Sequence, residues 1–396
     1  MKKIVGIIAA VAVLATSVFA ADVAAKVKLD GSLFNFDGTK KDAKVSGVSI
    51  QHNTDESWNP VLSMSTSTDN AGASVGFYVG NWDATKMGDW NHGYGIGAKE
   101  WKIWFKPLDA LRLNIGRIDA SLNTESIDWS NRIFNYDDWG YQAVYSADAL
   151  NISLALHTAN PGDKWLHQDY DAAKNETKTN IEGLALFGSY SADFGTISFL
   201  FDANSTFKDI KVGAGYKNTF GDINLFADVA MFYTKDRKST KKNSLPVDDP
   251  LGLGADVDVK YNKDAFGVEA YARFKMNRLK SDDKVCATGN VSDLSKLTYA
   301  NPMELMLLAK VTYKIDPVTV YGYFKSENLL AKRYIDTTND FYAGNSAFIS
   351  EIRIGANGNV GIASWNVYGK IETGNFYDGK FNAVKFSVPV EFSVGF

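Results

Sequence analysis

The sequence predicts an all-β fold, an antiparallel β-barrel that crosses a membrane, and three observations support this prediction. Short segments with an apolar residue at every second position recur along the chain. No run of about 18 apolar residues follows Ala20, so no transmembrane helix is expected, although 45% of the chain is hydrophobic. Turns of a few residues alternate with long polar stretches. A barrel with lipid outside and water inside has these properties, because lipid-facing and interior side chains alternate along each strand.

Residues 1–20 are predicted to form a secretory signal peptide. Lys2 and Lys3 precede an almost wholly apolar run from Ile4 to Leu14, and small residues follow up to Ala20. A retained membrane anchor is the alternative, but polar residues interrupt this run and follow it at once. We therefore expect cleavage after Ala20.

Residues 21–396 are expected to form a single barrel domain. No linker rich in proline or serine and no shift in composition marks a boundary within them. The formal net charge is −4 and the basic residues are dispersed, so nucleic acid is not an expected partner. Because Cys286 is the only cysteine, the fold cannot contain an internal disulfide.

Tight turns between alternating segments predict a series of β-hairpins. The turns are rich in Asp, Asn, Gly and Pro, which supply the backbone conformations and side-chain caps that hairpins need. In chain order they are predicted at 106–109, 146–149, 191–195, 217–222, 262–267, 314–317 and 357–361. Much longer polar connections are predicted at 118–138, 159–180, 235–254, 277–302 and 327–347. Short turns on one side of the membrane and long loops on the other are typical of such barrels.

The same pattern gives a strand count. Fifteen strands are predicted from Lys99 onward, and an odd number must precede them if both ends of the barrel lie on the side of the short turns. Four candidate segments are available, at 26–36, 45–52, 58–66 and 73–81. Taking one strand within 26–52, followed by a hairpin around Asp69-Asn70, gives eighteen strands. Sixteen strands is the alternative.

The last fourteen residues form the clearest predicted strand. Every second residue from Val384 to Phe396 is apolar, and the residues between are mostly polar. This segment resembles the closing strand of Gram-negative outer-membrane β-barrels, which typically ends on an aromatic residue. Together with the predicted signal peptide and the alternation of short turns and long loops, it makes the chain resemble the general porins. The resemblance implies that Phe392 and Phe396 belong to the barrel-closing strand. It also implies an outer-membrane location, recognition by the barrel-assembly machinery, contact with outer-membrane lipids, and a homotrimer.

Charged side chains on the polar phase of the strands predict a pore. A barrel of sixteen to eighteen strands is wide enough for an aqueous channel, in which charges stay hydrated at little cost. Lys102, Arg112, Arg273 and Arg353 are candidate pore-lining residues of this phase. The sequence therefore predicts a water-filled channel for passive diffusion of ions and small hydrophilic solutes.

A constriction is predicted from the same resemblance, because the third outer loop of general porins often folds into the pore. The corresponding segment, 118–138, contains Asp119, Glu125 and Asp128. Arg112 and Arg117 on the preceding strand would supply the opposing positive charge, although Arg117 needs a bulge to face inward. A solvated surface loop is the alternative.

Three other functions remain open at this point. A substrate-specific channel for a sugar or an anion is one, because several tyrosines share the interior phase: Tyr271, Tyr321, Tyr323 and Tyr368. A surface adhesin or antigen on a barrel scaffold is supported only by the long loops. The basic run at 235–243 would suit anionic lipopolysaccharide, but a solvated loop is the favoured interpretation.

Enzymatic activity is not expected. The four histidines have no Cys, His or Glu at a spacing typical of metal ligands, and no Gly-x-Ser-x-Gly motif is present. We therefore expect no catalytic residues, no metal and no cofactor.

Overall fold

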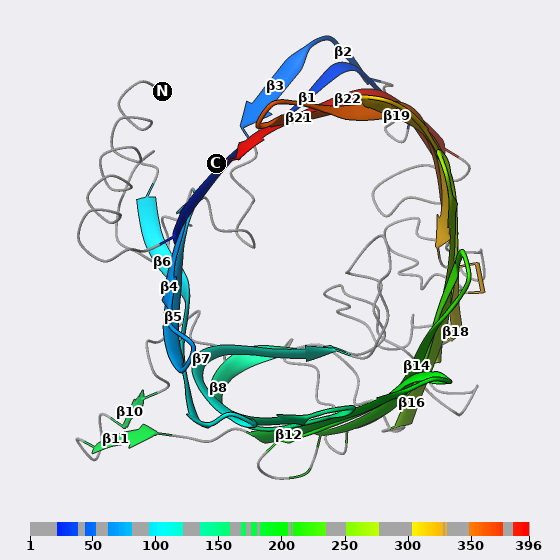
Figure 1. The fold of residues 1–396 in the computed structure, drawn as a ribbon. Coiled ribbons are helices and arrows are strands. Elements are labelled where there is room, and N and C mark those ends of the chain that lie inside the picture. Colours follow the sequence, from blue (N-terminus) through cyan, green and yellow to red (C-terminus); the bar gives the residue numbers. More distant parts are fainter. Residues whose placement is uncertain are drawn as a thin grey trace, which may run out of the picture.

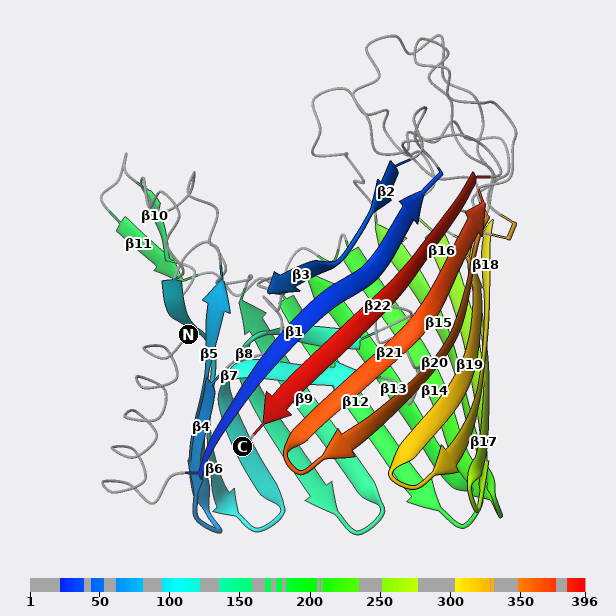
Figure 2. The same cartoon turned by 90° about the horizontal axis from the view of Figure 1, so that it is seen from above.

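The computed structural model describes residues 22–38, 44–52, 62–80, 95–121, 135–158, 168–171, 176–179, 183–204, 207, 209–234, 251–276, 303–327, 329–330, 348–374 and 383–395. These residues form a twenty-stranded sheet that closes on itself and a separate two-stranded hairpin, β10–β11 (Gln168–Asp171 and Glu176–Thr179). All pairings are antiparallel. Figure 1 shows the ring of strands along its axis, and Figure 2 shows the strands tilted across the wall. The predicted all-β antiparallel barrel is confirmed.

Eighteen of the twenty strands, all except β2 and β3, form the ring, and each pairs with the next in the series. In order they are β1 (Asp22–Asp37), β4 (Leu62–Ser67), β5 (Ala71–Gly80), β6 (Gly95–Leu108), β7 (Leu111–Ser121), β8 (Asn135–Ala147), β9 (Leu150–Thr158), β12 (Gly183–Ala192), β13 (Gly195–Asn204), β14 (Asp209–Phe220), β15 (Ile223–Thr234), β16 (Leu251–Lys263), β17 (Phe266–Met276), β18 (Met303–Ile315), β19 (Val318–Glu327), β20 (Ile349–Val360), β21 (Ala363–Gly374) and β22 (Ala383–Gly395).

The two remaining strands show how the start of the barrel differs from its prediction. β2 (Lys44–Ser46), β3 (Ser49–His52) and β4 all pair with β1, at successive points along it. Together they act as one interrupted strand beside β1. One strand was predicted within 26–52, where the candidate segments 26–36 and 45–52 were alternatives. The structure corrects this, because β1 and the start of its partner strand both lie in that range.

The barrel closes where its first and last strands meet. β22 pairs with β1 from Lys26↔Gly395 to Asp37↔Lys385, and its other edge pairs with β21. In a bilayer an open edge would leave backbone groups without partners, each costing several kcal/mol. Phe392 lies on this closing strand, opposite Leu29 and Trp365. Phe396 lies outside the described residues.

The short turns all lie at one end of the barrel, as predicted, along the lower edge in Figure 2. Asp148 and Asp264 adopt positive φ angles of 46° and 53° in their turns, and Gly221 and Gly361 adopt 61° and 59°. Left-handed backbone of this kind is accessible mainly to Gly, Asn and Asp, which explains the composition of the turns. Most of the predicted long connections lie outside the described residues, and so do the predicted signal peptide and Cys286.

The two faces of the sheet differ in polarity. Large apolar side chains on one phase are exposed on the outer surface; Val229 is 57% exposed and Ile354 is 72% exposed. The other phase, called the inward phase below, carries polar and charged residues, including the buried Asp228 and Asp258. This is the reverse of a soluble protein and suits a barrel with lipid outside. No helix among the described residues is long and apolar enough to span a membrane.

Candidate functional site

The inner wall over β19–β22 carries a cluster of aromatic and charged side chains around Arg353. The strand register places Arg353 between Tyr323 and Lys370. Its guanidinium carbon lies 4.7 Å from the ring centroid of Tyr323 and 5.2 Å from that of Tyr368. Its Nε donates a hydrogen bond to the carboxylate of Glu351. The two rings and the carboxylate together fix the orientation of the guanidinium group on the wall.

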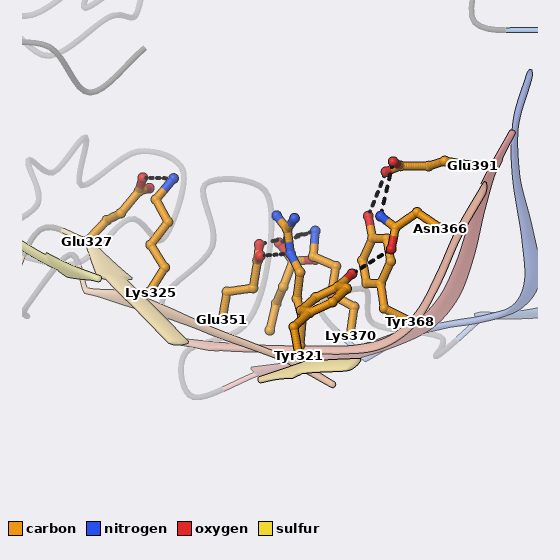
Figure 3. A network of polar contacts seen from close by, with 10 residues as sticks. Tyr321, Lys325, Glu327, Glu351, Asn366, Tyr368, Lys370 and Glu391 are labelled. Atoms are coloured by element: carbon orange, nitrogen blue, oxygen red, sulfur yellow. Dashed lines mark hydrogen bonds and ion pairs between the residues drawn. The ribbon is translucent and has the colours of Figure 1, made fainter. Parts of the chain in front are cut away.

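Ion pairs extend from this cluster across the neighbouring strands. Lys370 Nζ lies 3.3 Å from Glu351 Oε2 and 3.1 Å from Glu372 Oε1. On β19, Lys325 Nζ lies 2.5 Å from Glu327 Oε1. Figure 3 shows Lys325, Glu327, Glu351 and Lys370 on the concave side of the sheet. Positive and negative charges therefore compensate one another along this part of the wall.

A chain of hydrogen bonds from uncharged donors lies next to these ions, nearer the short turns. Tyr321 Oη donates to Asn366 Oδ1 over 2.8 Å, and Asn366 Nδ2 donates to Glu391 Oε2 over 3.2 Å. Tyr368 Oη donates to the other oxygen of Glu391, also over 3.2 Å. All four side chains are seen in Figure 3. Two tyrosines and one amide therefore hold the carboxylate of Glu391 at the inner surface.

Gly355 makes room for the two tyrosine rings. It lies directly between Tyr321 and Tyr368 in the register. A Cβ atom at this position would lie 2.5 Å from Cβ of Tyr368 and 2.9 Å from Cζ of Tyr321. Any larger residue would displace the rings that orient Asn366 and Glu391.

The wall formed by β13–β17 has a different character, because its carboxylates are buried. Asp256 accepts a hydrogen bond of 3.0 Å from Tyr271 Oη. Asp258 has no exposed surface, and its Oδ2 lies 3.5 Å from Lys260 Nζ, which is also 3.5 Å from Glu269 Oε1. Charges that reach water occur in both wall regions, because the side chain of Arg353 is 32% exposed and that of Lys211 on β14 is 44% exposed.

A third group of polar residues lies on β7–β9. Arg112 Nε donates to Asn114 Oδ1 over 2.8 Å, and Asn114 Nδ2 donates to Gln142 Oε1 over 2.7 Å. Gln142 Nε2 then donates to Ser153 Oγ over 3.2 Å. The guanidinium carbon of Arg112 also lies 4.7 Å from the ring centroid of Trp104 on β6. These contacts hold Arg112 on the inward phase.

The candidate pore-lining residues divide into two groups. The register puts Lys102, Arg112, Arg273 and Arg353 on the inward phase of β6, β7, β17 and β20. Arg117 lies opposite Trp139 and shares the other phase of β7 with Ile115. The part that each of these side chains plays in a pore stays a prediction.

The candidate constriction stays a prediction as well. Asp119 pairs with Asp137 in the β7–β8 ladder, where Ser121 is the last described residue of β7. Glu125 and Asp128 lie outside the described residues.

Sequence reasoning missed the network of Tyr321, Asn366, Tyr368 and Glu391. It placed three of the tyrosines near this site on the inward phase, but it did not bring them together with Asn366 and Glu391. The signal was present in the hairpin around 357–361, because folding β20 onto β21 about that turn sets Asn357 opposite Asn366. Among the described residues, no group of three or more His, Cys, Asp or Glu side chains is arranged to hold a metal ion.

The closed ring, the apolar outer surface and the charged inner wall define a transmembrane β-barrel, and comparison with known proteins identifies its type. No protein-family model and no curated protein sequence matches the chain. Several solved structures do match. OccAB3 of Acinetobacter baumannii is 12% identical, with 95% of this chain and 100% of that chain covered and a TM-score of 0.51.

Two further structures come from Pseudomonas aeruginosa. OccK8 (OprE) is 9% identical and the outer membrane protein OpdK is 12% identical. Each comparison covers 95% of this chain and 98% of the other, with TM-scores of 0.53 and 0.51. At this level of identity the likeness establishes the fold. The chain therefore has the antiparallel β-barrel fold of these outer-membrane proteins.

Proposed function

We propose that the protein is an outer-membrane channel through which ions and small hydrophilic solutes diffuse passively. The observation that carries this proposal is the partly exposed row of ion pairs on the inner wall, formed by Arg353, Glu351, Lys370 and Glu372. Such ion pairs carry a large desolvation penalty in a dry interior and a small one beside water. A ring of about eighteen strands is wide enough to hold that water.

A substrate-specific channel is the second candidate function. It is favoured by the convergence of Tyr321, Tyr368, Asn366 and Glu391 on one part of the wall, since binding sites combine aromatic surface with a few oriented polar groups. A surface adhesin has no comparable support among the described residues. We propose neither a catalytic role nor a cofactor for this wall.

Conductance in planar lipid bilayers tests the proposed function. Purified protein lacking residues 1–20 should insert and give ohmic current steps in potassium chloride. Current steps that no added solute reduces would favour passive diffusion. A current that one particular solute blocks would favour the substrate-specific channel. Protein that folds and inserts but carries no current would contradict both.

Several partner predictions belong to the same proposal. We propose that the barrel sits among outer-membrane lipids and lipopolysaccharide, is inserted by the barrel-assembly machinery, and forms a trimer. Chemical crosslinking of the protein in native membranes would reveal the trimer, and a band at the monomer mass alone would contradict it.

Replacing Arg353 with alanine is expected to shift the channel toward cations. The change removes one positive charge, while Glu351 and Glu372 stay in place beside Lys370. In water, the interaction energy between two unit charges about 4 Å apart is about 1 kcal/mol. Removing the repulsion from Arg353 should therefore raise the local cation concentration by at most about fivefold, and by less when salt screens the charges. The reversal potential in a potassium chloride gradient measures this shift.

Lys314→Ala is the matched control for Arg353→Ala. Lys314 lies beside a short turn, is 64% exposed, and forms its ion pair with Asp316, which is 87% exposed. An equal shift in the reversal potential of both variants would show that Arg353 has no special place along the ion path.

A further inference from the structure

A cavity of about 290 Å³ opens at the short-turn end of β20, β21 and β22. Six of its lining residues belong to the inward phase: Asn357, Asn359, Ser364, Asn366, Glu391 and Ser393. The volume is near the lower end of the range of roughly 300–1,000 Å³ seen for small-molecule sites. The cavity therefore suits a solute of one or two small rings.

The register arranges this lining in two levels across the strands. Asn357, Asn366 and Glu391 form one level, and Asn359, Ser364 and Ser393 form the next, closer to the turn. Each level consists of amides, hydroxyls and at most one carboxylate. The cations Arg353 and Lys370 lie further from the turn, beyond the level of Gly355 and Tyr368. The inward-phase part of the lining is therefore a mainly neutral hydrogen-bonding surface beyond a charged part of the wall, and Gly358, Trp365 and Phe392 complete the lining.

The hydrogen bonds in the cavity keep its polar groups in fixed orientations. The Asn366 amide is held between Tyr321 and Glu391. Each Glu391 oxygen accepts one described hydrogen bond, from Asn366 or from Tyr368, and a carboxylate has about four acceptor positions in all. Ser364 and Ser393 share a hydrogen bond of 2.5 Å. The wall thus offers both donors and acceptors to an incoming solute.

Neutral polyhydroxyl solutes match this surface. Each sugar hydroxyl both donates and accepts a hydrogen bond, so it can use carboxylate oxygens, amides and serine hydroxyls alike. The hydroxyls of Tyr321 and Tyr368 hold the hydrogen-bond network in place, while their rings lie outside the cavity lining. A solute without hydroxyls would leave the polar groups of the site without hydrogen-bond partners, which costs binding free energy. The site would therefore select solutes that carry hydroxyls.

From this cavity we infer a binding subsite for a neutral sugar of one or two rings at the short-turn mouth of the channel. The inference rests on the proposed channel function. A solute that crosses the barrel would leave the charged residues around Arg353 and pass this subsite last before it exits, or first if it enters from that end.

Single-channel recordings with sucrose as the probe test the subsite. Sucrose added to the short-turn side of the conducting protein should interrupt the current. Asn366→Ala removes the central amide and should shorten each interruption about fivefold to tenfold, because hydrogen-bond losses act mainly on the dissociation rate. Tyr368→Phe removes one hydroxyl but keeps the ring, and should shorten it about twofold to fivefold.

Asn224→Ala is the matched control. Asn224 is an inward-phase asparagine of β15 at the same end of the barrel, hydrogen bonded to Thr219 and not part of the cavity lining. It should leave the interruptions unchanged, and the open-channel steps of all three variants show that they fold. Two results would overturn the subsite while leaving the channel intact. One is an equally large shortening of the interruptions in Asn224→Ala, and the other is a current that sucrose never interrupts. Interruption by the dication putrescine but not by sucrose would overturn it too. Absence of current in the unaltered protein would instead overturn the channel itself.

Discussion

Replacing Ile354 with lysine is expected to destabilise the folded barrel in a bilayer by about 2–4 kcal/mol. Ile354 is 72% exposed and lies in the middle of β20, on the outer surface. A lysine there would hold a cation near the bilayer midplane, where no water solvates it. The preceding residue, Arg353, is a natural cation on the same strand, but it faces the inner wall.

Urea unfolding of the protein in lipid vesicles measures this effect. Asn224→Lys is the matched control, since it adds the same charge on the inward phase of β15, where water is expected. We expect a clear loss of stability for Ile354→Lys and little change for Asn224→Lys. The same loss in both variants would contradict the assignment of the two faces.

Replacing Gly116 with alanine is expected to prevent β6 and β7 from pairing as they do, at a cost of about 1–3 kcal/mol from backbone strain alone. Gly116 has a φ angle of +111°, which L side chains rarely adopt. A Cβ atom there would also lie 2.2 Å from the carbonyl oxygen of Trp101. Because that oxygen belongs to the backbone, no side-chain rotation can relieve the contact.

The folded fraction after refolding into detergent micelles, read from the mobility of unheated protein on a gel, measures the effect of Gly116→Ala. Gly188→Ala is the control, because a Cβ atom at Gly188 meets no atom within 4 Å and its backbone needs no positive φ. Normal folding of Gly116→Ala would show that the β6–β7 pair can shift at little cost.

The hairpins and the closing strand could be predicted because their signals are local. Turn residues such as Asp148 and Gly361 mark where the chain reverses, and a period of two assigns each side chain to a face. These local signals also predicted eighteen strands, with sixteen as the alternative, and the inward phase of Arg353.

The cross-strand contacts could not be predicted with the same means. Whether 45–52 and 58–66 form two strands or one interrupted strand depends on pairing with β1, which no local pattern specifies. The link from Tyr321 through Asn366 to Glu391 likewise joins residues on three strands. It becomes visible only when the register of each pair is known. The same register places Gly355 between Tyr321 and Tyr368, where its missing side chain leaves room for both rings.

The pairing of β1 with β22 has a consequence for how the polypeptide can be rearranged. Lys26 and Gly395 lie opposite each other, so a short linker could splice the end of the last strand to the start of the first. New termini could then be cut into a tight reversal such as that between Asp109 and Ala110. A circular permutant of this kind would keep every ladder of the cylinder, with only its starting point moved.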